Sequence, residues 1–125
     1  MKDKKILISL EFSGLPPSIN HSHINAHGRR FRTKECRDFQ AHIINELKLL
    51  WRNKPAFIGR AYLDLTLITN NKRRWDIDNR LKALQDCLTM AGVIKDDSQI
   101  DRIKIERLYQ SENKTLLRLF EIKKD

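Results

Sequence analysis

The stretch DIDNRLKALQDCLTMAG, at positions 76–92, predicts the helix around which the rest of the fold is organised. Its apolar residues recur at alternating intervals of four and three positions, which places them on one side of a helix. They are Ile77, Leu81, Leu84, Leu88 and Ala91. Gly92 follows directly, and glycine commonly ends a helix. We therefore expect a helix from about Asp78 to Ala91 with one buried stripe.

Carboxylates gather in and just after this stretch. Asp76 and Asp78 flank Ile77, and the pair Asp96-Asp97 follows the helix. Like-charged carboxylates repel one another, and a bound cation removes that penalty. Since Mg²⁺ prefers carboxylate oxygens, the cluster predicts a Mg²⁺ site. The simpler interpretation is that Asp78 caps the helix and pairs with Lys82, one turn on, and that Asp96-Asp97 is a polar turn.

The composition indicates one globular domain at positions 1–125. Hydrophobic residues make up 40% and charged residues 33% of the 125 residues. No apolar run approaches the ~20 residues of a membrane span, and the charged N-terminus does not resemble a signal peptide. Cys36 and Cys87 match no metal-ligand spacing, which favours inert thiols over a disulfide. We expect a cytoplasmic protein without membrane contact.

The basic charge of the chain favours a nucleic-acid partner. Lys and Arg number 25 against 16 Asp and Glu, which gives a formal net charge of +9. Two basic clusters are candidate contacts to the DNA backbone, where cations neutralise phosphates without reading sequence. They comprise Arg29, Arg30 and Arg32 (with Lys34) and Lys72, Arg73 and Arg74. An exposed basic surface without a ligand is the alternative interpretation.

The remaining pattern predicts strands and one further helix. Alternating residues indicate strands at 6–12 and 61–69, and two closing strands at 100–109 and 114–122 with their turn at 111–113. Residues 14–28 read as a loop, because proline and asparagine interrupt them. Thr33 is a plausible N-cap for a helix to about Trp51, with an apolar stripe of Phe39, Ile43, Leu47 and Leu50. The order β-α-β-α-β-β predicts an α/β (α+β) fold with a mixed sheet and two main helices.

The motif Asp-x-Asp-Asn-x-x-Lys-x-x-x-Asp-x-Leu at 76–88, followed by Ala91-Gly92 and Asp96-Asp97, resembles the RusA-type Holliday junction resolvases. Pro16-Pro17-Ser18-x-Asn20 is similar to the opening motif of that family. The resemblance covers nearly the whole chain, and the chain departs from the family pattern around His21-Ser22-His23. It implies a homodimeric, Mg²⁺-dependent endodeoxyribonuclease that resolves four-way DNA junctions by paired symmetric nicks, in recombination and repair in bacteria or their phages.

The resemblance also implies roles for individual residues. Asp76, Asp78 and Asp97 match metal-coordinating positions, and Lys82 matches the catalytic lysine. A metal ion lowers the pKa of bound water and stabilises charge on phosphate oxygens, and lysine adds a positive charge at the reacting phosphate. Asp96 matches the less certain member of its pair. Asn79 and Asp86 match supporting positions.

Other interpretations stay open from the sequence. A non-catalytic architectural DNA-binding protein would use the same acids as caps and ion pairs, and a nuclease acting on flaps or single strands would use the same site. His21, His23 and His27 suggest zinc, but no further ligand completes a tetrahedral set, which favours a solvated or DNA-facing loop. Trp51 and Trp75 fit a core or a dimer interface better than base stacking.

Overall fold

The computed structural model describes residues 4–18, 23–26, 29–70, 72 and 75–123. The predicted strands at both ends of the chain, the strand at 61–69 and the two main helices are confirmed. In chain order, the elements are β1 (Lys4–Ser13), β2 (His23–Ala26), β3 (Arg29–Arg32), α1 (Lys34–Trp51), β4 (Ala61–Thr69), the 3₁₀ turn η1 (Ile77–Arg80), α2 (Leu81–Met90), the 3₁₀ turn η2 (Asp97–Gln99), β5 (Ile100–Tyr109) and β6 (Lys114–Ile122).

The main sheet has four strands in the order β1-β6-β4-β5. Strands β4 and β5 pair in parallel, and the other neighbours pair antiparallel, so the sheet is mixed as predicted. Strands β5 and β6 do not pair with each other, because β4 lies between them. Their connection crosses the end of β4, where Gln110 donates a backbone hydrogen bond to Thr69 and the Asn113 side chain accepts one from Asn70 N. The predicted turn is therefore present, but it does not close a hairpin.

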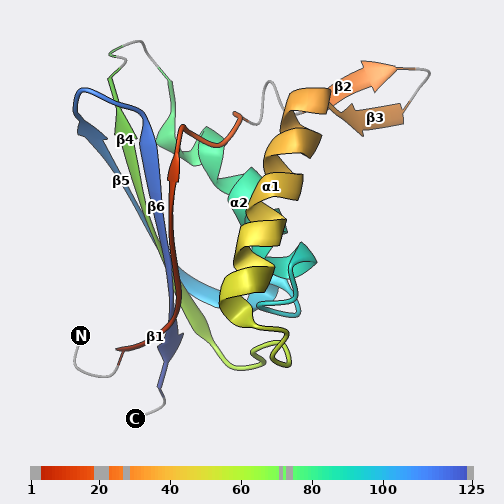
Figure 1. Ribbon diagram of the computed structural model, residues 1–125, viewed down its shortest axis with the longest axis vertical. Helices are drawn as coiled ribbons and strands as arrows, with labels where there is room; N and C mark the ends of the chain where they lie inside the picture. Colours follow the sequence, from red (N-terminus) through yellow and green to blue (C-terminus); the bar gives the residue numbers. More distant parts are fainter. Residues whose placement is uncertain (1–3, 19–22, 27–28, 71, 73–74, 124–125) are drawn as a thin grey trace.

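Both long helices cover one face of this sheet (Figure 1). The interior is built from leucines that alternate along β4 and β6 and from the apolar sides of the two helices. Fully buried members include Leu63, Leu65, Leu117, Leu119, Ile43, Leu47, Leu84 and Leu88. The predicted stripe of α1 was wrong at its last position, because Leu50 is 46% exposed and Trp51 is buried instead. Burial of Trp51 confirms its predicted core position.

The boundaries of α1 follow from its capping residues. Thr33 is the N-cap, and its hydroxyl accepts a 3.2 Å hydrogen bond from Cys36 N, as predicted. The helix ends after Trp51, and its C-cap residue, Arg52, adopts a left-handed conformation with φ 57°. Buried Gln40 then ties the two helices together, because its side-chain amide donates to Ala83 O at 3.2 Å. This bond fixes the helix pair beneath the candidate site.

The second helix differs from the prediction at its start. A 3₁₀ turn, η1, precedes α2, and Ile77 within it is only half-buried. Asp78 lies inside η1 and caps no helix, because the N-cap positions of η1 and α2 are Asp76 and Arg80. The predicted helix end is confirmed, since Gly92 has φ 78°. Asp78 therefore lies on the surface, and its carboxylate does not cap a helix.

Strands β2 and β3 form a two-stranded hairpin, and β2 falls within the segment that was expected to be a loop. The hairpin projects beyond the start of α1, away from the main sheet (Figure 1). The prediction of an irregular segment over 14–28 was therefore wrong for His23–Ala26. The pairing of His23 with Arg32 and of Ala26 with Arg29 brings the first basic cluster onto this hairpin.

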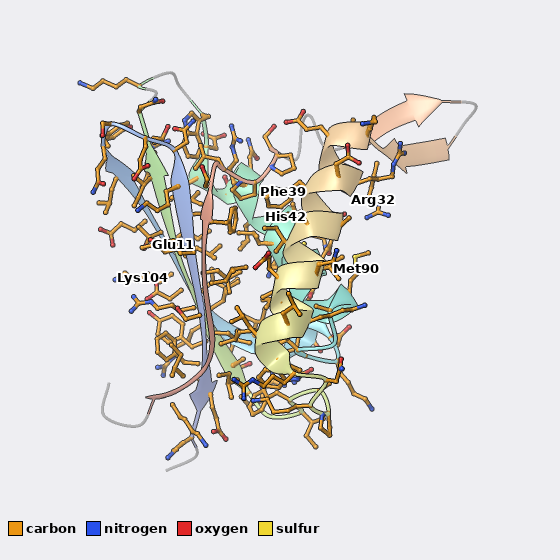
Figure 2. The ribbon with its side chains drawn as sticks, viewed as in Figure 1. Glu11, Arg32, Phe39, His42, Met90 and Lys104 are labelled. Carbon is orange, nitrogen blue, oxygen red and sulfur yellow. The ribbon has the colours of Figure 1, made fainter. Side chains whose placement is uncertain are left out.

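The described helices leave the other face of the main sheet uncovered. Glu11 and Lys104 lie on that side, as Figure 2 shows. Asp64, buried in the same sheet, accepts a 2.9 Å bond from Arg118. Within the described part of the chain, no helix is long and apolar enough to span a membrane. Cys36 and Cys87 are free and buried, as expected for inert thiols.

Candidate active site

The first half of the site is the segment that links β4 to α2. Asp76 is exposed, and its side chain makes no cap hydrogen bond to the turn that it begins. Its carbonyl accepts a 3.2 Å bond from Asn79 N. Asp78 is also exposed, one residue into η1. The interpretation of Asp78 as a helix cap is therefore wrong, and Asp76 occupies the N-cap position of η1 without a side-chain cap bond.

Lys82, on helix α2, contacts the second half of the site, which is the turn η2 that carries Asp97. Its ammonium lies 2.7 Å from Asp86 Oδ1 and 3.2 Å from Asp97 Oδ2. The hydrogen bond to Asp86, followed by that to Asp97, raises the pKa of Lys82 above its usual value against the effect of partial burial. Lys82 is therefore a fixed positive charge at neutral pH. Its predicted ion pair with Asp78 is replaced by pairs with Asp86 and Asp97.

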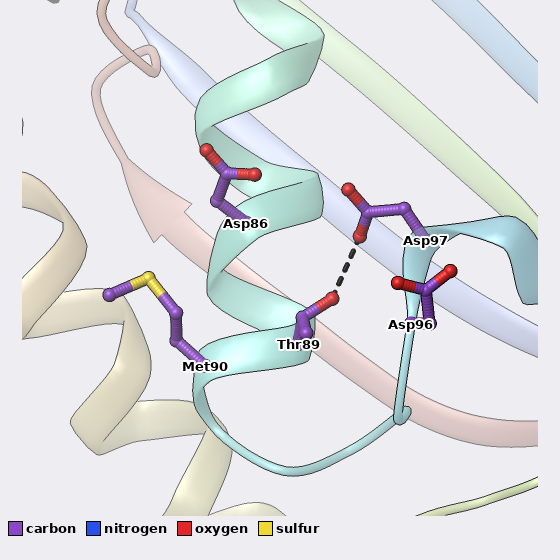
Figure 3. Close-up of a pocket in the computed structure, with 5 residues that line it drawn as sticks. All are labelled: Asp86, Thr89, Met90, Asp96 and Asp97. Atoms are coloured by element: carbon purple, nitrogen blue, oxygen red, sulfur yellow. Dashed lines mark hydrogen bonds between the residues drawn. The ribbon is translucent and has the colours of Figure 1, made fainter.

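Asp97 is held from two sides. Thr89 Oγ1 donates a 2.7 Å hydrogen bond to Asp97 Oδ1, while Lys82 contacts the other oxygen. A shallow pocket of about 170 Å³ opens here, lined by Asp86, Thr89, Met90, Asp96 and Asp97 (Figure 3). The stripe of α2 that faces it carries Lys82, Asp86 and Thr89, which follow one another at intervals of four and three residues. This geometry brings Asp97 into contact with α2 through Lys82 and Thr89.

Asp96 has a structural role that separates it from Asp97. Its side chain accepts a 2.9 Å bond from Ser98 N and forms a capping box with Gln99. Hydrogen bonds from Ser98 lower the pKa of the Asp96 carboxyl. The Gln99 side chain also donates to the carbonyls of Phe57 and Gly59, which anchors the turn. Of the paired acids, Asp96 therefore stabilises the turn, whereas Asp97 contacts α2 through Lys82 and Thr89.

The described residues form no preformed cage for a metal ion. No three His, Cys, Asp or Glu side chains in that part of the chain are arranged to hold one. The donor chemistry of Asp76, Asp78 and Asp97 nevertheless fits a hard divalent cation, because all three supply carboxylate oxygens. Their metal-binding role stays a prediction.

The predicted DNA-contacting residues fall in several places. The Arg32 guanidinium donates to the Gln40 side chain, which places Arg32 against α1. Lys72 is exposed beyond β4. Arg29 and Arg30 belong to β3, and His23 belongs to β2, but their side chains lie outside the described residues. Arg73, Arg74, His21 and His27 also lie outside the described residues.

Sequence reasoning gave no role in the site to three residues near Asp76. The Arg80 and Arg107 guanidinium groups lie 4.9 and 4.7 Å from the centre of the Trp75 ring. Arg107 also donates a 2.7 Å hydrogen bond to Trp75 O. Trp75 is half-buried, so it is only partly the core residue expected. Arg80 lies inside the motif, and this position could have marked it as a site residue. Arg107 lies in β5, and no feature of the sequence indicated a role for it.

Comparison with known proteins places this chain in a family. The family model for endodeoxyribonuclease RusA matches residues 14–119. A crossover junction endodeoxyribonuclease RusA of Aquifex aeolicus (strain VF5) is 35% identical over 105 residues, 80% of this chain and 82% of that protein. A crossover junction endodeoxyribonuclease of Enterobacteria phage HK97 is 34% identical over 100 residues, 74% of this chain and 76% of that protein. The chain therefore belongs to the RusA family of endodeoxyribonucleases.

Proposed function

We propose that this protein is a structure-selective endodeoxyribonuclease that resolves four-way DNA junctions in recombination and repair. The observation that carries the proposal is the contact between Lys82 and Asp97. These residues lie 15 positions apart in the two acidic parts of the motif, and their side chains meet at 3.2 Å. A helix cap or a surface turn does not require this juxtaposition, whereas metal-assisted phosphodiester hydrolysis uses carboxylates and a cation beside the reacting phosphate.

Mg²⁺ is the proposed cofactor, with Asp76, Asp78 and Asp97 as its protein ligands. When bound, the ion would supply an acidified water and charge stabilisation at the phosphate oxygens. Lys82 would place a further positive charge at the transferring phosphate or the leaving oxygen. Asp86 would hold the Lys82 ammonium in place through their 2.7 Å contact.

The net charge of +9 supports an extended contact with the DNA backbone. We propose that the arginines of the β3 hairpin strand and Lys72 contribute to it, together with Arg73 and Arg74 from the segment before η1. A homodimer would present one site to each of two symmetry-related strands, which suits paired nicks on a four-way junction. The proposed location is the cytoplasm of a bacterial or phage-infected cell.

The decisive experiment is cleavage of a synthetic mobile four-way junction with Mg²⁺ and with EDTA. Linear duplex and flap substrates serve as structural controls, and Asp78→Asn serves as the site variant. Paired symmetric nicks on the junction alone, lost with EDTA and in Asp78→Asn, are expected. Sedimentation of the free protein would report the dimer independently of cleavage.

The variant must also be compared in binding. Asp78→Asn removes one charge at an exposed position, so folding and junction affinity are expected to survive while cleavage is lost. Tight junction binding by the wild type without cutting in any divalent metal would identify an architectural protein instead. Cutting of flaps in preference to junctions would assign the same site to a different substrate.

A further inference from the structure

Trp75 immediately precedes the candidate metal ligand Asp76, and two arginines hold it from different elements. Arg80 comes from η1, and Arg107 comes from β5. Their guanidinium carbons lie 4.9 and 4.7 Å from the centre of the Trp75 ring, within the range of cation–π attraction. Since Arg107 belongs to β5, which pairs in parallel with β4, its contact ties the ring to the sheet.

The backbone around Asp76 is fixed on both sides. Arg107 Nη1 donates to Trp75 O at 2.7 Å, and this carbonyl belongs to the peptide group that leads into Asp76. The next carbonyl, that of Asp76, accepts the bond from Asn79 N. Two successive peptide groups are therefore oriented by hydrogen bonds, while the Asp76 side chain makes no cap bond.

Arg80 adds a link to the N-terminal motif. Its Nη1 donates a 2.7 Å hydrogen bond to the carbonyl of buried Pro16. Its Nε is buried and has no hydrogen-bond partner within the described part of the chain. Burial lowers the pKa of Arg80, and Glu35 opposes that effect. Arg80 therefore connects the Trp75 ring to the N-terminal segment at Pro16.

We propose that Arg107, Arg80 and Trp75 form a positioning clamp, which holds the Asp76 carboxylate in the orientation needed to bind the divalent metal. The inference rests on the proposed function, because it takes Asp76 to be a metal ligand. Residues that orient a metal ligand commonly change metal affinity or activity about 10-fold to 100-fold when replaced. The clamp is expected to set the Mg²⁺ requirement of the nuclease and to leave its affinity for DNA unchanged.

The test compares Arg107→Gln with Lys104→Gln. Both variants remove one positive charge from β5, but Lys104 lies on the face without helices, paired with Glu106. Arg107→Gln is expected to raise the Mg²⁺ concentration for half-maximal cleavage about tenfold, with cleavage recovering at high Mg²⁺. Lys104→Gln is expected to leave the Mg²⁺ requirement as in the wild type.

Two readouts do not depend on cleavage. Junction binding in EDTA is expected to be equal in the two variants. The rise in melting temperature on adding Mg²⁺ or Mn²⁺ is expected in the wild type and in Lys104→Gln, and is expected to need about tenfold more metal in Arg107→Gln. A merely stabilising contact would lower the melting temperature by the same amount with and without metal.

Further variants keep the test decisive. Arg107→Lys retains the charge without the planar fork, so it is expected to restore part of the metal response. If Arg107→Gln does not fold, Trp75→Leu removes the ring while both arginines remain, and the same shift in Mg²⁺ requirement is expected. An unchanged Mg²⁺ requirement in a folded clamp variant overturns the clamp. A loss confined to junction binding in EDTA also overturns it, because Trp75 or Arg107 would then contact DNA.

The experiments distinguish failure of the clamp proposal from failure of the proposed function. A wild type that cuts the junction with Mg²⁺ and loses cutting in Asp76→Asn upholds the nuclease site, whatever the clamp variants do. A wild type that neither cuts nor responds to metal removes the basis of both.

Discussion

Thr89 donates a 2.7 Å hydrogen bond from its hydroxyl to Asp97 Oδ1, across the gap between α2 and the turn that precedes β5. The bond leaves Asp97 with one oxygen oriented by the helix and the other beside Lys82 at 3.2 Å. A carboxylate held in this way is already oriented before any ligand arrives, which reduces the ordering that binding must impose. Thr89 was not expected to take part in the site.

Replacing Thr89 by valine tests this orientation. Thr89→Val keeps the branched shape and removes the donor, so cleavage is expected to fall about 10-fold and the Mg²⁺ requirement to rise. Thr66→Val is the matched control, because Thr66 alternates with buried Leu65 and Leu67 along β4 and so lies on the opposite face of the sheet. Junction cleavage across a Mg²⁺ titration gives the measurement. Equal activities for the two variants would show that Thr89 has no influence on Asp97.

Replacing Lys82 by methionine removes the charge that joins the two parts of the site. Cleavage is expected to fall at least about 100-fold, because the cation is predicted to stabilise negative charge on the reacting phosphate. Junction binding is expected to fall far less, as one charge among 25 Lys and Arg. Single-turnover cleavage and a binding titration at fixed salt separate the two quantities. Lys104→Met controls for the lost charge, and a similar cleavage defect in it would contradict the role of Lys82.

The two thiols are expected to be unreactive in the folded protein. Burial, followed by Asp86 and Cys36, raises the pKa of Cys87 to about 12, and burial also raises the pKa of Cys36. Both groups therefore stay protonated at pH 8, and only thiolates attack a disulfide reagent. Reaction with a chromogenic disulfide at pH 8 is expected only after unfolding in guanidinium. Rapid labelling of the native protein would show that the α1–α2 interface opens.

The same shifts affect stability at alkaline pH. Because the folded-state pKa of Cys87 is raised, its contribution is fully present below the unfolded-state value and is lost as the pH rises toward about 12. Chemical unfolding between pH 7 and 10.5 is expected to show falling stability above about pH 9. Cys87→Ala is expected to flatten that decline.

The core assignment of α1 is tested by two leucines on one helix. Leu47→Ala, at a fully buried position, is expected to lower the free energy of unfolding by about 2–5 kcal/mol. Leu50→Ala, at a position 46% exposed, is expected to change it by less than about 0.5 kcal/mol. Urea unfolding followed by circular dichroism measures both. Equal losses would mean that Leu50 packs against another surface, as in a dimer.

Periodicity was sufficient to predict most of the elements. Alternation gave β1 and β4, the four-three spacing gave α2, and Thr33 gave the start of α1. The hairpin β2–β3 was not predicted, because each strand has only four residues and charged arginines occupy β3. Gly28 stands between the two strands in the sequence, and a glycine at that position is typical of a short hairpin turn.

The sequence could not give the partners of individual strands or side chains. The residues at 111–113 are polar and predict a turn, but they do not say that β4 separates β5 from β6. The motif similarly predicted Lys82 and Asp97 as site residues without predicting that they touch. Residues Trp75 and Arg107 meet only because β5 lies beside β4 in parallel. Such contacts depend on tertiary packing, which spacing along the chain does not encode.

The position of β6 between β1 and β4 has a consequence for biosynthesis. The first strand gains its neighbour in the main sheet only when residues 114–122 have left the ribosome. Until then the nascent chain can form the β4–β5 pair and its helix, but the candidate site rests on an incomplete sheet. Contacts between distant parts of a chain also form slowly. Premature termination before residue 114 is therefore expected to give a protein that does not fold and does not act on DNA.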